Sequence, residues 1–271
     1  SDRRQDGGFS VSRIEKRLAS LNGNKALVAF YTAGDPDLSA SKDIFAVIEK
    51  NGADIIEIGV PFSDPLADGP TIQASSHRSL QNGTTLKKII QLVVDIRKTS
   101  ELPIILMTSF NPIFVYGQKE FVADAVNAGV DGVIIPDLPP EEAEGFLGFA
   151  EGLDMIFLLA PTSTPARVQQ VGKISKGFVY YISLTGTTGT KESLSAGLEE
   201  KVKEIKNTVS LPVLVGFGVS GPEQARQAAQ ISDGVIIGSA IVKLIYTHSD
   251  PAERDLKLAE FLTSIQKAIN P

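Results

Sequence analysis

The chain has 271 residues, of which 42% are hydrophobic and 21% are charged, and its formal net charge is −6. This composition is typical of an ordinary folded domain. The acidic balance and the lack of a basic run give no electrostatic basis for binding nucleic acid or an anionic membrane. The absence of cysteine excludes disulfides and thiolate-based metal or catalytic sites. No apolar run reaches the roughly 18 residues of a membrane span.

The first eight residues are polar and end in glycine, so we expect residues 1–8 to be disordered and residues 9–271 to form one domain. Short β-branched runs then alternate with amphipathic stretches to the end of the chain. Several runs, such as Gly132–Pro136, are apolar throughout, which is typical of parallel strands covered on both faces. The predicted strands are Ala26–Ala33, Asp54–Val60, Pro103–Ser109, Gly132–Asp137, Met155–Ala160, Phe178–Leu184, Pro212–Gly218 and Gly234–Gly238.

Helical periodicity separates these strands, and Pro165 and Pro222 stand near first helical positions. The predicted helices are Ser39–Asn51, Leu86–Lys98, Lys119–Ala128, Glu141–Glu151, Thr164–Ser175, Leu198–Asn207 and Pro222–Ile231. Extra helices are expected before the first strand, over Ser12–Leu21, and after the eighth, over Asp255–Ala268. Eight strand–helix units in series, with no linker, predict an α/β fold: a single-domain (β/α)8 TIM barrel.

Chemistry in such a barrel gathers at the carboxyl ends of the strands. Glu57 lies within the second predicted strand, where alternation leaves its facing uncertain by one residue. If it points into the barrel mouth, desolvation raises its pKa and lets it donate and accept a proton near neutral pH. The alternative is a structural carboxylate. No lysine stands at a strand end, and His77 and His248 lie off the strands, so acid–base chemistry falls to carboxylates.

Asp68 lies in an unusually long loop that three prolines stiffen. A solvated carboxylate there stays ionised and suits a general base, although the same residue could cap a helix that opens at Pro70. Gly216–Gly218 and Gly238–Ala240 close the last two strands, which is the usual phosphate position in these barrels. The loop Leu184–Thr190 is rich in Gly and Thr, and this composition fits a mobile lid over the ligand as well as an ordinary surface loop.

Residues 56–69, Ile56 to Gly69, resemble the signature of the tryptophan synthase α chain family. The likeness extends over nearly the whole chain after about residue 10. It includes Thr32–Pro36, Gly186–Gly189, Gly216–Ser220 and Gly238–Lys243. The resemblance implies a carbon–carbon lyase that cleaves indole-3-glycerol phosphate to indole and D-glyceraldehyde 3-phosphate in tryptophan biosynthesis.

By position, the resemblance implies catalytic roles for Glu57, Asp68 and Tyr180. The implied substrate contacts are Phe30, Ile72, Thr188, Gly189, Phe217, Gly218, Gly238 and Ser239. The implied partner contacts are Asp64, Pro65, Asn111, and Asp137 to Pro139, and the apolar run Pro112–Val115 fits either a protein contact or core packing. Leu184 departs from the arginine of some members, which puts the electrostatics of the lid in doubt.

The family further implies docking onto a pyridoxal-phosphate-dependent β subunit in an α-β-β-α heterotetramer. It implies no metal and no cofactor in this chain, and a cytoplasmic location, or the plastid stroma for a plant protein. Three alternatives stay open: a stand-alone indole-3-glycerol-phosphate lyase that releases free indole, another phosphosugar enzyme on the same barrel, and a catalytically silent binding subunit. The second would not need the pair Glu57 and Asp68, and their presence argues against the third.

Overall fold

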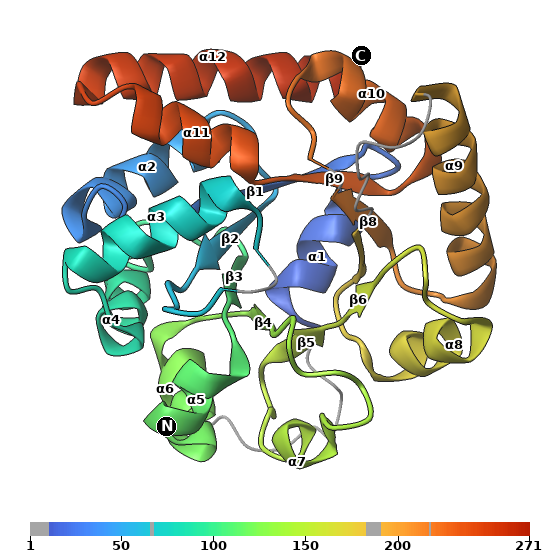
Figure 1. Ribbon diagram of the computed structural model, residues 1–271, viewed down its shortest axis with the longest axis horizontal. Coiled ribbons are helices and arrows are strands. Elements are labelled where there is room, and N and C mark those ends of the chain that lie inside the picture. Colours follow the sequence, from blue (N-terminus) through green and yellow to red (C-terminus); the bar gives the residue numbers. More distant parts are fainter. Residues whose placement is uncertain (1–10, 66–67, 183–190, 217) are drawn as a thin grey trace.

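The computed structural model describes residues 11–65, 68–182, 191–216 and 218–271, so the predicted disorder of residues 1–8 falls outside the described residues. The strands there form one parallel sheet in the order β5-β4-β3-β2-β1-β9-β8-β7-β6 (Figure 1). The two end strands of that order are separated in the chain only by Phe157, so the sheet closes into a barrel. The predicted strand Met155–Ala160 is therefore present as two short strands, β5 and β6, which together cross the barrel wall once.

The strands begin and end within a few residues of the predicted bounds. They are β1 (Ala26–Thr32), β2 (Ile55–Gly59), β3 (Ile104–Met107), β4 (Gly132–Ile134), β5 (Asp154–Ile156), β6 (Leu158–Leu159), β7 (Val179–Ile182), β8 (Val213–Gly216) and β9 (Gly234–Ile237). The eight passes around the barrel confirm the predicted TIM-barrel fold.

Helices surround the ring of strands (Figure 1). They are α1 (Arg13–Ser20), α2 (Leu38–Lys50), α3 (Pro70–Gln81), α4 (Leu86–Ile96), α5 (Phe110–Tyr116), α6 (Gln118–Ala128), α7 (Glu144–Leu147), α8 (Pro165–Ile174), α9 (Lys191–Thr208), α10 (Pro222–Ile231), α11 (Ser239–Thr247) and α12 (Pro251–Ile269). Side-chain caps at Ser12, Asp37, Thr85, Thr164 and Asp250 accept a backbone N–H of the first turn and so fix where five of these helices begin.

One predicted helix is largely wrong. The segment Glu141–Glu151 forms only the four-residue α7, because Gly145 and Gly148 lower its helix propensity. Conversely, α5 was not predicted, and neither were the extents of α3 and α11, although a helix opening at Pro70 was considered.

The buried side chains form two cores, one inside the barrel and one between the strands and the helices. Along β2, Ile55 belongs to the inner core, whereas Ile56 and Ile58 belong to the outer one. Since side chains alternate along a strand, Glu57 follows Ile55 and points into the barrel. The facing that the sequence left open is thereby decided.

Helix α1 closes the amino-terminal end of the barrel. Its Ile14 is fully buried in the inner core. Arg17 donates to Asp54 at 2.8 Å and Arg13 donates to Asp131 at 2.8 Å, and these two aspartates immediately precede β2 and β4. The opposite, carboxyl-terminal end is therefore the one open to ligands.

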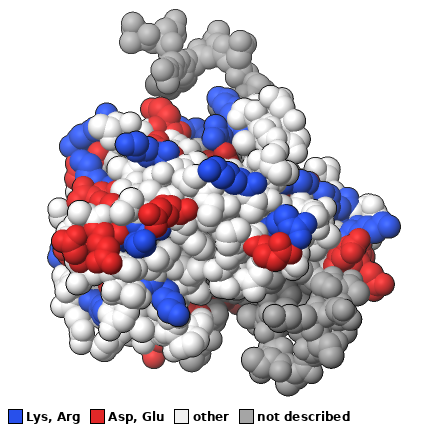
Figure 2. All heavy atoms as spheres, turned by 90° about the horizontal axis from the view of Figure 1, so that it is seen from above, with Lys and Arg blue, Asp and Glu red and all other residues white. Residues whose placement is uncertain are grey.

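The described helices include none long and apolar enough to cross a membrane. On the face seen from above, Lys and Arg side chains lie among Asp and Glu side chains rather than in one basic patch (Figure 2).

Candidate active site

A layer of inward-facing side chains forms the floor of the barrel mouth. Its members stand two residues beyond members of the inner core, as Phe30 follows Val28 and Tyr180 follows Phe178. On β8 and β9 the corresponding residues are Gly216 and Gly238, whose lack of a side chain leaves room for Tyr180 and Phe30.

Glu57 is 1% exposed, and its Oε2 atom has no hydrogen-bond partner among the described residues. Burial, followed by the charge of Asp68, raises the pKa of Glu57 to about 8. A buried carboxyl without a cation partner favours its protonated form. Glu57 can therefore donate a proton at neutral pH and take one back, as the sequence predicts for an inward-facing glutamate.

Asp68 stands at the end of the loop between β2 and α3 and lines the cavity at the barrel mouth. Its main chain is held locally, because its N–H donates to the Pro65 carbonyl at 3.0 Å and its carbonyl accepts from Gln73 Nε2 at 2.8 Å. Burial raises the pKa of its carboxyl to about 6. The expectation of a fully solvated carboxylate is thus wrong, although the group is still largely ionised at neutral pH. The helix N-cap is Gly69, not Asp68.

Tyr180 lies near both carboxylates. Burial and the negative charges of Glu57 and Asp68 hold the pKa of its phenol well above the ordinary value, so the phenol stays protonated and can act as a hydrogen-bond donor. Glycine is required next to it, because a Cβ on Gly216 would lie 2.7 Å from the Tyr180 hydroxyl oxygen. Similarly, a Cβ on Gly59 would lie 2.5 Å from Cζ of Phe30.

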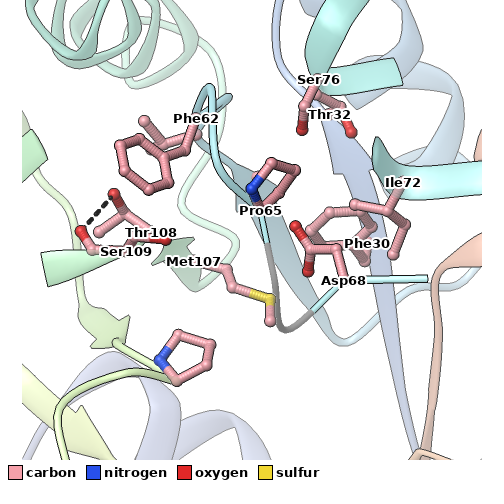
Figure 3. A pocket seen from close by; sticks show the side chains of 13 residues that line it. Phe30, Thr32, Phe62, Pro65, Asp68, Ile72, Ser76, Met107, Thr108 and Ser109 are labelled. Atoms are coloured by element: carbon pink, nitrogen blue, oxygen red, sulfur yellow. Dashed lines mark hydrogen bonds between the residues drawn. The ribbon is translucent and has the colours of Figure 1, made fainter. Parts of the chain in front are cut away.

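The cavity beside Asp68 holds about 420 Å³, including its open mouth. Figure 3 shows Asp68, Ile72 and Phe30 on one side of it and Phe62 on the other. The wall combines apolar side chains with the carboxyl of Asp68 and the hydroxyls of Thr32, Ser76, Thr108 and Ser109. A wall of this mixed kind suits a small ligand that has both an apolar and a polar part.

The ends of β8 and β9 offer backbone amides to an anion. Gly218 adopts φ +72°, a conformation that glycine takes without strain. Helix α11 begins at Ser239 after Gly238, and no side chain among the described residues caps it, so its first N–H groups can bind a ligand. Of the other expected substrate contacts, Thr188, Gly189 and Phe217 lie outside the described residues, as does Leu184.

The expected partner contacts all lie at this end of the barrel, on the loops after β2 and β4 and, for Asn111, in helix α5 after β3. Asp64, Asn111 and Asp137 are exposed, whereas Pro65 and Pro139 are partly buried. Asp137 also has a local role, since its Oδ1 accepts from the Phe110 N–H at 2.8 Å at the start of α5.

In helix α5, the apolar run Pro112–Val115 lies partly in the protein core and partly on the surface. Ile113 is fully buried, whereas Phe114 is 63% exposed and Val115 is 77% exposed. Core packing therefore explains Ile113, and the other two side chains form an apolar surface patch.

Sequence reasoning did not single out several residues of the cavity, among them Ser76, Met107 and Pro136. Two could have been found from strand alternation, because Met107 stands two residues beyond Ile105 and Pro136 two beyond Ile134. Ser76 stands one helical turn after Ile72, so the helix that begins at Pro70 places it on the same face.

The described residues contain no group of three or more His, Cys, Asp or Glu side chains arranged to hold a metal ion. The carboxyl-terminal mouth of this (β/α)8 barrel carries a glutamate that favours its protonated form, an aspartate that favours its ionised form, and a tyrosine. These groups are typical of the class of enzymes that perform acid–base chemistry on a small molecule.

Comparison with known proteins identifies the member of that class. The family model described as tryptophan synthase alpha chain matches residues 17–270. The tryptophan synthase alpha chain of Geotalea uraniireducens is 51% identical over 96% of this chain and 98% of its own length. That of Geobacter sulfurreducens is 49% identical over 96% and 99%. The crystal structure of tryptophan synthase subunit alpha from Legionella pneumophila superposes with a TM-score of 0.88 at 36% identity, covering 96% of this chain and 99% of that one.

The chain belongs to the tryptophan synthase α chain family. This confirms the resemblance seen in the sequence, and with it the expected lyase activity on indole-3-glycerol phosphate in tryptophan biosynthesis.

Proposed function

We propose that Glu57 and Asp68 carry out the cleavage between them, Glu57 on the carbon side and Asp68 on the nitrogen side of the indole ring. One observation carries this proposal: a buried glutamate, whose Oε2 atom has no hydrogen-bond partner among the described residues, lies near an aspartate that lines the cavity at the barrel mouth. The surroundings of Glu57 and Asp68 give the two carboxyls different pKa values, so that at neutral pH Glu57 can act as an acid and Asp68 as a base.

The proposed reaction is a retro-aldol cleavage. Glu57 donates its proton to indole C3 while Asp68 accepts the N1 proton, which gives an indolenine. The Glu57 carboxylate then removes the proton of the glycerol hydroxyl next to the ring. The carbon–carbon bond breaks, its electron pair returns to the ring, and Asp68 returns its proton to N1. Each positioned proton transfer contributes on the order of 10²–10⁴-fold to the rate.

Tyr180 and the anion-binding end complete the proposed site. We propose that the protonated phenol of Tyr180 orients Glu57, because the negative charge of Glu57 contributes to the raised pKa of Tyr180 and the two groups therefore lie close together. We propose that Gly218, Gly238 and Ser239 bind the substrate phosphate through backbone amides, and the positively polarised start of α11 supports this. Phe30 and Ile72 would hold the ring in the cavity. The same phosphate role for Gly189 and Phe217, and a lid role for Thr188, stay predictions.

This chemistry needs no cofactor in this chain, because the protonated ring itself accepts the electron pair of the broken bond. We propose that pyridoxal phosphate belongs to a β subunit, with which the chain forms an α-β-β-α heterotetramer. The exposed Phe114 and Val115 support a protein contact next to Asn111 and Asp137. The bacterial sources of the relatives named above support a cytoplasmic location rather than a plastid.

The test is steady-state indole release from indole-3-glycerol phosphate. Replacement of Glu57 by glutamine should lower kcat by at least about 10²-fold with little change in KM, because the side chain keeps its size but loses its proton chemistry. Asp154→Asn is a matched control, since it neutralises a buried carboxyl at the opposite end of the barrel and should leave kcat within about twofold. Wild-type turnover by the glutamine variant would refute the assignment.

The same assay with and without a β subunit distinguishes a subunit of the heterotetramer from a stand-alone indole-3-glycerol-phosphate lyase. A subunit of the heterotetramer is strongly activated by its partner, whereas a stand-alone lyase reaches its full rate alone.

A further inference from the structure

One face of α3 is bound to the end of β1 by polar side chains rather than by apolar packing. Ser75 and Ser79 are fully buried there, one helical turn apart. Each residue from 32 to 36 accepts or shares at least one hydrogen bond from this face. We call this contact the β1–α3 polar seam. It joins Ser75, Arg78 and Ser79 of α3, and Asn82 directly after the helix, to Thr32, Ala33, Gly34, Asp35 and Pro36.

The hydroxyl groups of the seam lead to the cavity wall. Thr32 Oγ1 lies 2.6 Å from Ser75 Oγ, and Ser75 Oγ donates to the Ile72 carbonyl at 2.8 Å. Because Ser75 uses its only proton on that carbonyl, Thr32 is the donor in the first bond. Ser79 Oγ donates to the Ala33 carbonyl at 2.5 Å. Thr32 and Ile72 both line the cavity (Figure 3).

An ion pair completes the seam farther from the cavity. Arg78 binds the buried carboxylate of Asp35 through two nitrogens, with Nε–Oδ1 at 2.9 Å and Nη2–Oδ2 at 2.6 Å. The guanidinium also lies over the ring of Tyr246 on α11, 4.1 Å from its centroid. A bidentate pair restrains orientation as well as distance.

The start of α3 determines the position of Asp68. Only Gly69 separates Asp68 from Pro70, the first residue of the helix. Gln73, in the first turn, donates to the Asp68 carbonyl at 2.8 Å. A shift of α3 along β1 would therefore carry Asp68 with it, whereas Glu57 on β2 would stay in place.

We propose that Ser75, Arg78 and Ser79 are positioning residues, which fix the Asp68 carboxylate relative to Glu57 through the β1–α3 polar seam. This rests on the proposed role of Asp68. Hydrogen bonds to consecutive residues define the register and rotation of the helix, which apolar contact alone defines less sharply. Precise placement matters, since a misplacement of about 1 Å costs on the order of 10²-fold in rate.

The test is a double-mutant cycle on indole release. Ser79→Ala should lower kcat at least about tenfold and change KM less than about twofold, because Asp68 acts in the transition state. In an Asp68→Asn background, with residual cleavage followed over hours, the same change should lower kcat less than about twofold. Gln81→Ala is the matched control, on the same helix but exposed, and should leave kcat unchanged.

The outcomes separate this proposal from the function on which it rests. Equal losses from Ser79→Ala in the two backgrounds would show a general structural effect and overturn the positioning role. Wild-type kcat in Asp68→Asn alone would instead refute the role of Asp68.

Arg78→Lys provides a second measurement should Ser79→Ala not fold. It keeps the charge next to Asp35 and loses the bidentate geometry. We expect its crystal structure to show the Asp68 carboxylate displaced by about 1 Å, with kcat reduced accordingly. An unmoved carboxylate at wild-type kcat would overturn the proposal.

Discussion

Glu57 occupies a position that destabilises the folded chain. Burial raises the pKa of its carboxyl to about 8, so the folded state keeps a proton that the unfolded state loses above about pH 4.5. Stability therefore falls as the pH rises through that window. We predict that Glu57→Gln is more stable than the wild type by about 2–4 kcal/mol at pH 8 and equally stable near pH 4.5. Urea unfolding at the two pH values measures this, and an equal difference at both would contradict it.

The two carboxyls should also set the pH dependence of the reaction. Asp68 acts ionised, with its pKa raised to about 6, and Glu57 acts protonated, with its pKa raised to about 8. We predict that kcat/KM rises with pH through about 6 and falls through about 8. In Asp68→Asn the residual activity should lose the acidic limb and keep the alkaline one. A profile of unchanged shape in that variant would show that another group titrates.

Among the helices, α1 has a purely structural role. Ile14 fills the amino-terminal end of the inner core, at the opposite end of the barrel from the cavity. We predict that Ile14→Ala lowers the free energy of unfolding by about 2–5 kcal/mol through the space it leaves, while kcat stays within about twofold. Val11→Ala, at a residue 51% exposed just before the helix, should change neither. A loss of kcat at full stability in Ile14→Ala would assign α1 a functional role.

The elements that could be predicted from the sequence are those with a clear apolar period, namely the strands and helices such as α2 and α4. The extent of α3 could not, because its buried face consists of Ser75, Ser76 and Ser79, which give no hydrophobic period. Of these serines, Ser75 and Ser79 also belong to the β1–α3 polar seam. Glu57 and Asp68 were singled out from their places in the second strand and the loop after it, but the facing of Glu57 required the barrel itself.

On the scale of the whole molecule, the two ends of the barrel use carboxylates differently. At the amino-terminal end, three aspartates hold neighbouring strands together: Asp54, Asp131 and Asp233. Each accepts a hydrogen bond from the backbone N–H of a residue at the start of the neighbouring strand, and each also pairs with an Arg or Lys side chain. At the carboxyl-terminal end, the Oε2 atom of Glu57 has no hydrogen-bond partner among the described residues. The aspartates that join neighbouring strands thus lie at the opposite end of the barrel from the reactive carboxyl group of Glu57.

We expect the partner surface at the reactive end of the barrel, where Phe114 and Val115 are exposed. Phe114 lies on α5, and its ring lies 6.3 Å from that of Phe110, which lies 6.4 Å from that of the buried Phe146. An exposed aromatic side chain is the kind of residue that contributes strongly to a protein interface.

We therefore predict that Phe114→Ala raises the Kd for the β subunit at least about tenfold, while the indole release of the chain alone is unchanged. Titration calorimetry gives the affinity, and the steady-state assay without partner gives the activity. Leu256→Ala is the control: Leu256 is 56% exposed on α12, far from α5 in Figure 1, and its loss should leave Kd unchanged. If the two variants bind the β subunit equally well, the interface lies elsewhere. If Phe114→Ala loses activity when alone, the ring supports the barrel mouth rather than the partner.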